Sequence, residues 1–232
     1  MTLYETIFVR RSVRKYDKTP LDDETLRGIQ KILDEAERID GQTGRFEIVV
    51  GSRVKNATAP HYIFAFSEAN DGAYANVGYV LQKVDLYLQS IGVGSVWLGA
   101  GKPVESAPDY VIMLAFGKTE VPLRSGAQDF RRLVLGEISD GDNAVAQAAR
   151  LAPSAANSQP WKLHFEDGKV TVRYFGRGLL KAMLKKMNKV DIGIVLRHIE
   201  IALLKEGKTV RSVTATAAAG GGDLTAEITY VD

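Results

Sequence analysis

The sequence contains no cysteine. This absence excludes thiol catalysis, disulfide bonds and any zinc or iron–sulfur site that depends on cysteine ligands. The chain also has only three histidines, His61, His164 and His198, and none of them forms a pair with metal-ligand spacing. We therefore expect these histidines to have structural or surface roles. The most apolar stretch, residues 91–100, is too short and too rich in glycine to span a bilayer.

An excess of charge of one sign is also missing. The 30 basic and 28 acidic residues among 232 leave a net charge of +2, and 45% of the residues are apolar. This balance does not favour nucleic acid or a membrane surface as a partner, and it is typical of one compact globular domain. Because the sequence shows neither a signal segment nor a disulfide framework, we expect a cytoplasmic protein.

Helical and strand patterns alternate in two successive runs. Asp22 is a good N-cap, and Leu26, Ile29 and Leu33 follow it at helical spacing. In the first run the patterns predict helices at 3–9, 22–36 and 74–91, and strands at 46–50, 63–66, 95–98 and 110–116. In the second run they predict helices at 143–151 and 191–205, strands at 162–165, 170–174, 209–216 and 225–231, and a turn at 217–222.

The two runs are related by a constant offset of 115 residues, which pairs Gly78 with Gly193 and Phe46 with Trp161. A register that holds across two helices and two strands predicts an internal duplication, with repeats at about 1–118 and 119–232. The alternative is a chance alignment of two amphipathic helices. Two similar halves in one domain, residues 1–232, would create a cleft between them, where a ligand site would draw residues from both.

Two segments have unusual compositions for their positions. The first, Arg10-Arg11-Ser12-Val13-Arg14-Lys15-Tyr16, places four cations and a hydroxyl directly after the first helix. These cations fit either of two roles, offsetting the helix dipole or binding a phosphate dianion. The second segment, residues 152–161, reads Ala-Pro-Ser-Ala-Ala-Asn-Ser-Gln-Pro-Trp. It is compatible with a polar connecting loop, or with a loop whose small residues let a flat ligand approach the backbone.

Together these segments resemble the signatures of the nitroreductase family. The opening Arg-Arg-Ser-x-Arg-x-Tyr with the following Pro-Leu-Asp-Asp-Glu-Thr-Leu is similar to the first signature, and residues 149–161 are similar to the second. Residues 88–99 resemble the helix-to-loop segment beside the flavin in that family. The resemblance implies an α+β fold, with a mainly antiparallel sheet flanked by helices in two pseudo-symmetric halves. It also implies FMN as the cofactor.

The arrangement of the signatures departs from the usual pattern of the family. A typical member carries both in one short N-terminal stretch and pairs as two identical subunits. Here they lie about half a chain apart, and the first copy of the second signature, residues 38–46, is degenerate. The chain therefore resembles a fused branch that folds as a pseudo-dimer with one flavin site. A monomer is implied, and further dimerisation stays open.

The resemblance assigns roles by position to the first segment and to the residues that follow the core strands. Arg10 and Ser12, with Arg11 nearby, would hold the FMN phosphate. Arg14 would reach the pyrimidine edge of the flavin and stabilise negative charge there. A further phosphate ligand is expected from three arginines between which the sequence does not choose, and each of them also fits a basic surface loop. These are Arg124, Arg131 and Arg132.

Further contacts are assigned to the second half and to the segment beside the flavin. Pro153, Ser154 and Asn157 would hold the ribityl chain and the ring, with Gln159 as an additional contact. The backbone at 98–100, which comprises Leu98, Gly99 and Ala100, would meet flavin N5. Outside these motifs, Asp191 and Glu200 are expected on a solvated helix face, and Trp97 and Trp161 in the core.

The implied activity is the reduction of electron-poor acceptors, such as nitroaromatics or quinones, by NAD(P)H. Hydride would pass to FMN and then to the acceptor in a ping-pong sequence, so that no protein acid or nucleophile is required. Two alternatives remain open, a specialised flavin reaction such as reductive dehalogenation and a non-catalytic FMN-binding protein. The sequence does not distinguish NADH from NADPH and does not identify the acceptor.

Overall fold

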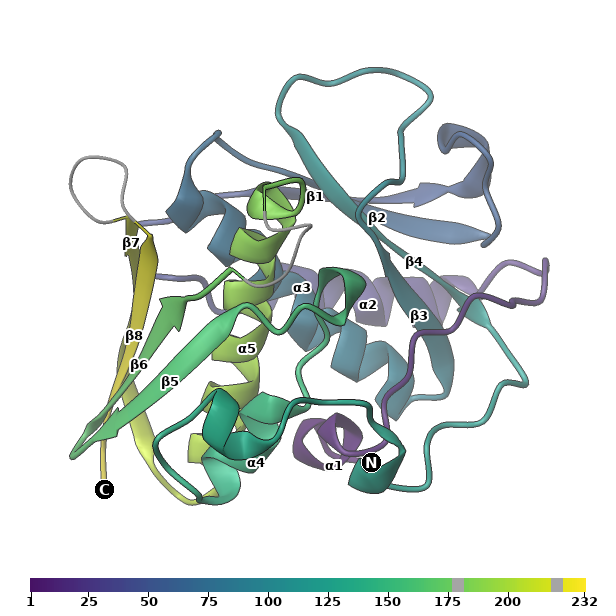
Figure 1. Ribbon diagram of the computed structural model, residues 1–232. Helices are drawn as coiled ribbons and strands as arrows, with labels where there is room; N and C mark the ends of the chain where they lie inside the picture. The colour runs from purple at the N-terminus through teal and green to yellow at the C-terminus, as the bar shows by residue number, and fades with distance from the viewer. Residues whose placement is uncertain (177–181, 218–222) are drawn as a thin grey trace.

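The computed structural model describes residues 1–176, 182–217 and 223–232 (Figure 1). The predicted elements are present, although α5 begins well before the expected start at Asp191, and most of the predicted turn at 217–222 lies outside the described residues. Asp22 caps its helix as expected, because its Oδ1 accepts a hydrogen bond of 2.8 Å from the Thr25 N–H. The helices are α1 (Leu3–Ile7), α2 (Asp23–Glu35), α3 (Asp71–Ser90), α4 (Ala144–Arg150) and α5 (Lys185–Lys205).

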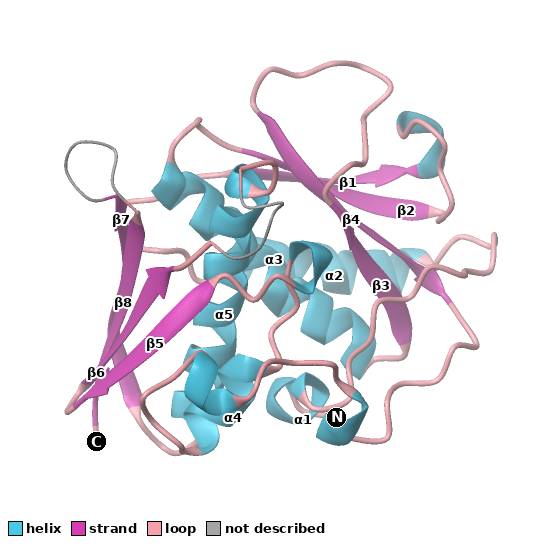
Figure 2. Cartoon of the chain, in the orientation of Figure 1, coloured by secondary structure: helices cyan, strands magenta, loops and turns pink. Residues whose placement is uncertain are grey.

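The strands form two separate antiparallel sheets of four strands each. The first sheet contains β1 (Arg45–Val50), β2 (His61–Phe66), β3 (Val93–Leu98) and β4 (Tyr110–Lys118). The second contains β5 (Trp161–Glu166), β6 (Lys169–Tyr174), β7 (Thr209–Ala217) and β8 (Leu224–Val231). The strand order β1-β2-β4-β3 in the first sheet is repeated as β5-β6-β8-β7 in the second. Figure 2 shows the helices between the two sheets, so the fold is α+β with two similar halves.

The long helices α3 and α5 form the centre of the molecule. In α3, 15 of 20 residues are buried, and in α5 the number is 16 of 21. The helices touch through glycines, because a Cβ on Gly78 would lie 1.9 Å from the Val190 carbonyl oxygen. A Cβ on Gly193 would lie 1.7 Å from the carbonyl oxygen of Ala75. Both contacts are related by the offset of 115 residues, so the crossing is locally two-fold.

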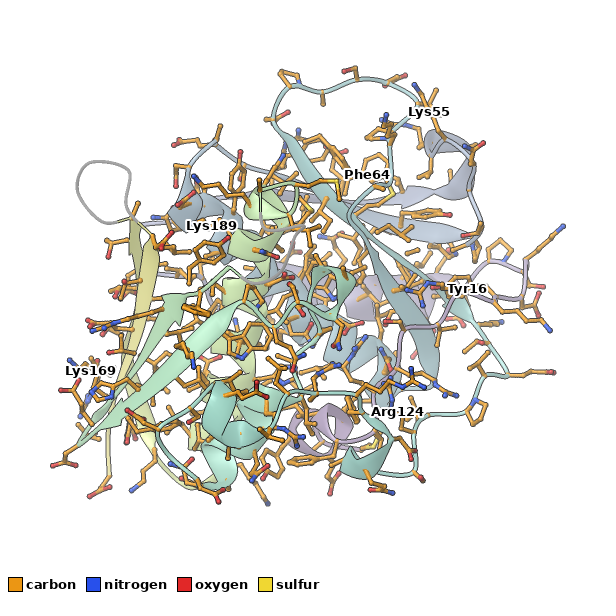
Figure 3. The ribbon with its side chains drawn as sticks, viewed as in Figure 1. Tyr16, Lys55, Phe64, Arg124, Lys169 and Lys189 are labelled. Atoms are coloured by element: carbon orange, nitrogen blue, oxygen red, sulfur yellow. The ribbon has the colours of Figure 1, made fainter. Side chains whose placement is uncertain are left out.

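The first sheet packs on both of its faces. Ile63 and Leu114 belong to the main core that the sheet shares with α3 and α5. Tyr62, Phe64 and Met113 point to the opposite face and form a smaller outer core, and Tyr16 packs against this outer core (Figure 3). The alternation of side chains along β2 and β4 therefore buries both faces of this sheet. The segment that contains Tyr16 is thereby attached to the sheet.

Candidate functional site

The arginine-rich segment after α1 runs along β3. The Val13 N–H donates a hydrogen bond of 2.9 Å to the Ser95 carbonyl oxygen, and the Tyr16 hydroxyl donates to the Val13 carbonyl oxygen at 2.5 Å. Val13 is buried, whereas Ser12 and Arg14 on either side of it are exposed. The extended backbone thus alternates its side chains and presents Ser12 and Arg14 to the same side. This side faces the loop that precedes β5.

A cavity of about 560 Å³, which we call the basic cavity, lies between this segment and the loop 153–157. Asp129 is the single acidic residue in its described lining. Arg124 is labelled in Figure 3 beside α1. Six arginines line the cavity: Arg10, Arg11, Arg14, Arg124, Arg131 and Arg132. A cavity with this charge suits a phosphate group.

Arg10 is held by a buried network of side chains from α3 and β3. Its side chain is 2% exposed, and its Nε lies 3.0 Å from Oδ2 of Asp85, which is fully buried. The Ser95 hydroxyl donates to the other Asp85 oxygen at 2.5 Å, and Gln89 donates to the Ser95 hydroxyl at 3.0 Å. The Oε1 of Gln89 accepts the Arg11 N–H at 2.8 Å. The network fixes both arginines, and it leaves Arg10 Nη2 without a hydrogen-bond partner in the described structure.

Arg132 is the most constrained member of the cluster. It donates to Asn157 Oδ1 at 2.6 Å and to the Leu151 carbonyl oxygen at 3.1 Å, while its buried Nε has no partner among the described residues. Burial, together with the positive charges of Arg10 and Arg124, lowers the pKa of Arg132 to about 9. A shift in this direction means that the positive form is destabilised. An anion bound in the basic cavity would stabilise the charged guanidinium group of Arg132.

The loop 153–157 has an unusual backbone conformation. Ala156, Asn157 and Gln159 have φ angles of +51°, +55° and +47°, in the left-handed region that costs energy for residues with a Cβ. Hydrogen bonds hold this shape, since Asn157 donates to the Arg131 carbonyl oxygen at 2.9 Å, and the Gln159 N–H donates to Ser154 Oγ at 2.9 Å. A strained segment that its surroundings fix in this way is characteristic of ligand sites.

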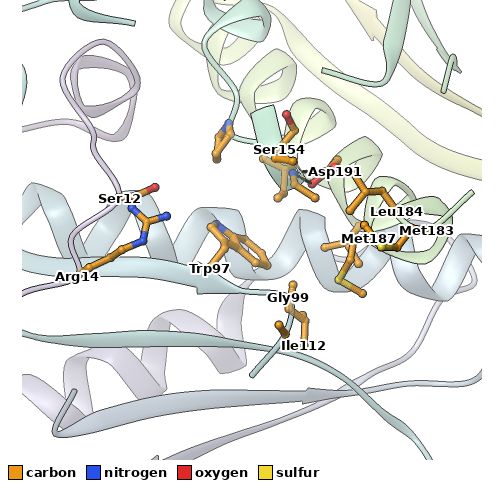
Figure 4. A pocket seen from close by; sticks show the side chains of 16 residues that line it. Ser12, Arg14, Trp97, Gly99, Ile112, Ser154, Met183, Leu184, Met187 and Asp191 are labelled. Carbon is orange, nitrogen blue, oxygen red and sulfur yellow. Dashed lines mark hydrogen bonds between the residues drawn. The ribbon is translucent and has the colours of Figure 1, made fainter. Parts of the chain in front are cut away.

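A second cavity of about 460 Å³, which we call the apolar cavity, continues from the basic one. The two share lining residues, which are Ser12, Arg14, Pro153, Ser154 and Ala156. Figure 4 shows Trp97 in the middle of the apolar cavity, with Arg14 on one side and Met187 on the other. Gly99 allows β3 to end close to α5, because a Cβ there would lie 3.2 Å from Met187 Sδ. The combined cleft therefore has a cationic end and a largely apolar end.

The structure brings most of the predicted site residues into this cleft. The apolar cavity includes Gly99, Ala100, Pro153 and Ser154, and the basic cavity includes Asn157 and all three candidate arginines. Leu98 and Gln159 are outside the described lining of both cavities. Leu98 packs against the outer core of the first sheet. Gln159 is buried, and its Oε1 accepts the Leu133 N–H at 2.9 Å. Its side chain therefore links the loop to the segment at Leu133.

Neither a membrane-spanning helix nor a metal-binding cluster is found among the described residues. Within the described ranges, no helix has both the length and the apolarity needed to cross a membrane. No group of three or more histidine, aspartate or glutamate side chains in the same ranges is arranged to hold a metal ion.

A family model described as "Putative TM nitroreductase" matches residues 2–203. The chain belongs to the nitroreductase family. A nitroreductase-family structure from Thermotoga maritima, described as a "putative nitroreductase", is similar to this chain with 20% identity and a TM-score of 0.73. The similarity covers 99% of this chain and 94% of that protein, so the same fold extends over the whole length. No curated protein matches the chain.

Shorter family members resemble only part of the chain. A "putative nitroreductase in complex with FMN" from Desulfovibrio desulfuricans has 19% identity and a TM-score of 0.48, covering 62% of this chain and 98% of that one. An "FMN-dependent Nitroreductase" from Clostridium difficile R20291 has 18% identity and a TM-score of 0.46, covering 58% of this chain and 96% of that one.

Two predictions about residues outside the signatures of this family member were wrong. Asp191 and Glu200 are 4% and 5% exposed rather than solvated, because α5 is covered by α3, α4 and the second sheet. Glu200 pairs with Arg197, which is also buried. Asp191 lines the apolar cavity, and burial raises its pKa well above the usual range of a carboxyl group. Trp97 packs against the main core, as predicted, and it also lines the same cavity.

The α5 side of the apolar cavity was not anticipated from the sequence. Met187, Val190 and Ile194 follow each other at helical spacing and line the cavity with Asp191. An apolar stripe at this spacing is also what a core helix shows, so it gave no separate signal. The acid within the stripe, Asp191, was the one residue whose type does not suit a core position.

Proposed function

We propose that this chain is an FMN-dependent oxidoreductase that uses NAD(P)H to reduce nitroaromatics, quinones or similar electron-poor acceptors. The observation that carries the proposal is the continuous cleft, whose cationic end suits a phosphate and whose largely apolar end suits a flat ring system. The apolar part, at about 460 Å³, lies within the range of about 300–1,000 Å³ that is typical of small-molecule sites. The FMN-bound and FMN-dependent relatives support this choice of cofactor.

The residues present fit the phosphate of FMN. Arg10 and Arg132 each have a buried nitrogen without a partner among the described residues, and both line the basic cavity. Arg131 is exposed at the rim, and Ser12 adds a hydroxyl next to the arginines. Charge-assisted hydrogen bonds from these groups would compensate both the unsatisfied donors and the repulsion between the guanidinium groups.

The remaining residues of the cleft fit the other parts of the cofactor. Pro153, Ser154 and Ala156 line both cavities, so the loop would contact the chain between phosphate and ring. When bound, FMN supplies the acceptance and donation of hydride. Arg14 is the single cation in the described lining of the apolar cavity, and it would stabilise negative charge at the edge of a ring held there. Trp97 and Met187 would exclude water from the ring.

We also propose that the chain is an internal duplication with one site, which folds as a monomer. At the position that corresponds to the cleft in the other half, the backbone closes the space, because the Asp40 N–H donates to the Val213 carbonyl oxygen at 2.8 Å. The side chain of Gln42 packs there against Gly72, where an added Cβ would lie 2.8 Å from Gln42 Nε2. The lack of cysteine is compatible with a cytoplasmic location.

The first test is the visible spectrum of the purified protein, followed by quantification of the flavin that heating releases. We expect a yellow protein with about one FMN per chain. Two FMN per chain would contradict the single site, and a colourless protein that does not take up added FMN would refute the proposed function. Stopped-flow bleaching by NADH and by NADPH then tests the donor, and steady-state reduction of a quinone or a nitroaromatic tests the acceptor.

A further inference from the structure

Asp191 is an isolated acid within an apolar wall. It is the one carboxyl group in the described lining of the apolar cavity, and Figure 4 shows it near Met187 of the same helix. Val190 and Ile194 of this helix line the cavity as well. Its side chain forms no ion pair among the described residues, and both of its oxygens lie 3.1 Å from a single donor, the Ala155 N–H. Burial without a cation favours the neutral acid. A neutral carboxyl group keeps an O–H donor in addition to its acceptor oxygen.

The charged groups around Asp191 do not neutralise it by pairing. Lys189, two residues earlier on α5, directs its Nζ to Asp71 at 2.8 Å. Lys186 donates to the Tyr110 carbonyl oxygen at 3.2 Å. Arg14 enters the apolar cavity from the segment after α1, and no hydrogen bond links it to Asp191 in the described structure. From the loop 153–157, the group that contacts the Asp191 carboxyl is the backbone N–H of Ala155.

The other half of the molecule contains a natural comparison. At an offset of 115 residues, Asp191 corresponds to Asn76 on α3, which is also fully buried. Asn76 Oδ1 accepts the Ile39 N–H at 3.0 Å, and Ile39 lies one position before the counterpart of Ala155, the donor to Asp191. Its amide group donates to the Thr43 carbonyl oxygen at 3.3 Å, so both ends of the side chain are used. A neutral amide is therefore sufficient to hold the loop where no cavity is present.

We propose that Asp191 is a substrate-recognition residue, whose neutral carboxyl group donates a hydrogen bond to an oxygen of a flat aromatic acceptor, such as a quinone carbonyl or a nitro group. Loop support alone does not require an acid at this position, as Asn76 shows. The donor at Asp191 faces a cavity, whereas the donor of Asn76 is satisfied by the backbone. This inference rests on the proposed function, because it assigns a residue to the acceptor that the FMN-containing protein would reduce.

The entrance to the apolar cavity fits such an acceptor. Met187 lies one helical turn before Asp191, so the two side chains share a face of α5. Trp97 and Gly99 form the opposing wall at the end of β3. With the flavin ring against Trp97, a planar acceptor stacked on the flavin would lie on the α5 side of the cavity and gain a sulfur–aromatic contact with Met187. A ring substituent directed inward would then reach the carboxyl group.

The test measures binding of two ring compounds to the FMN-loaded protein without NAD(P)H, by isothermal titration calorimetry. The compounds are 1,4-naphthoquinone, which carries oxygen acceptors, and naphthalene, which does not. In Asp191→Leu we expect naphthoquinone to bind about tenfold more weakly and naphthalene to bind at least as well as in the wild type. In Asp191→Asn the amide donor should keep naphthoquinone affinity within about threefold. Asn76→Asp, a matched change away from the cavity, should leave both affinities unchanged.

An infrared difference spectrum of wild type minus Asp191→Asn provides a second measurement. A purely loop-supporting role of Asp191 would not change its signal when a ring compound binds. We expect a protonated carboxyl band at neutral pH that shifts when naphthoquinone binds. Equal weakening of both ring compounds in Asp191→Leu, no weakening of naphthoquinone, or no protonated band would each overturn the inference. A loss in Asp191→Leu that is confined to FMN affinity would also overturn the inference. A protein that binds no FMN would instead refute the proposed function, before any question about Asp191 arises.

Discussion

The contact between α3 and α5 allows a quantitative prediction for Gly78→Ala. The new Cβ would lie 1.9 Å from the Val190 carbonyl oxygen, whereas ordinary contacts of a Cβ begin near 3.4 Å. The helices must therefore separate, since neither partner is a flexible side chain. Overpacking of this kind costs about 3 kcal/mol. The better helix propensity of alanine returns about 1 kcal/mol. The net loss is about 2 kcal/mol, and the melting temperature should fall by about 4–8 °C for a domain of this size.

The assay is thermal unfolding of Gly78→Ala and of its counterpart Gly193→Ala, with Gly28→Ala as the control. Gly28 is also within a helix, but a Cβ there meets only the tip of Tyr87 at 3.2 Å, so this variant should gain up to about 1 kcal/mol. The double variant at the crossing should lose less than the sum of the single losses, because the first alanine already separates the helices. The reasoning is refuted if Gly78→Ala is as stable as Gly28→Ala.

Three further predictions concern the charges of the site. Arg132→Ala should weaken FMN binding about 10- to 100-fold, measured by fluorescence titration of the apoprotein, while the exposed Arg173→Ala leaves it unchanged. Asp85→Asn leaves Arg10 buried without its counter-charge, and it should lower the free energy of unfolding by about 3–5 kcal/mol in urea denaturation. Asp191→Asn should be more stable than the wild type at neutral pH. Because burial raises the folded-state pKa of Asp191, the folded protein holds a proton that the unfolded chain releases above about pH 4. The advantage of the variant should therefore grow from pH 4 upward by up to about 1.4 kcal/mol per pH unit, and a difference independent of pH would contradict this assignment.

The sequence was sufficient for the helices and strands because their patterns are local. Asp22 begins a helix by bonding to the next turn, and an apolar stripe or alternation marks each long element. The division of the strands into two sheets was not predicted, since strand pairing joins residues far apart in the chain. The early start of α5 was missed for a related reason. Its first turn has no side-chain N-cap and little apolar periodicity to mark it.

The candidate site was predictable where a motif carries its chemistry in residue type. Arginines beside a serine suit a phosphate, and the structure does bring Arg10, Arg11 and Arg14 to the basic cavity. The choice among Arg124, Arg131 and Arg132 was left open by the sequence, and the structure places all three in that cavity. Gln159 belongs to the same motif but lines neither cavity, because its side chain is buried and its Oε1 accepts the Leu133 N–H.

Comparison of the two halves shows why a cavity lies beside one loop and not beside its counterpart in the described structure. In both halves a side chain from the central helix holds the preceding loop through one backbone N–H, Asn76 in the first and Asp191 in the second. In the first half the loop also bonds to β7 through Asp40, so strand and loop close the space between them. Beside the loop of the second half, β3 ends at Leu98, and the following Gly99 faces Met187 instead. A neutral amide is favoured where the space is closed, because a buried acid without a cation destabilises the fold at neutral pH. An acid retained at the open position therefore lowers stability, and this is the expected signature of a residue kept for binding rather than for folding.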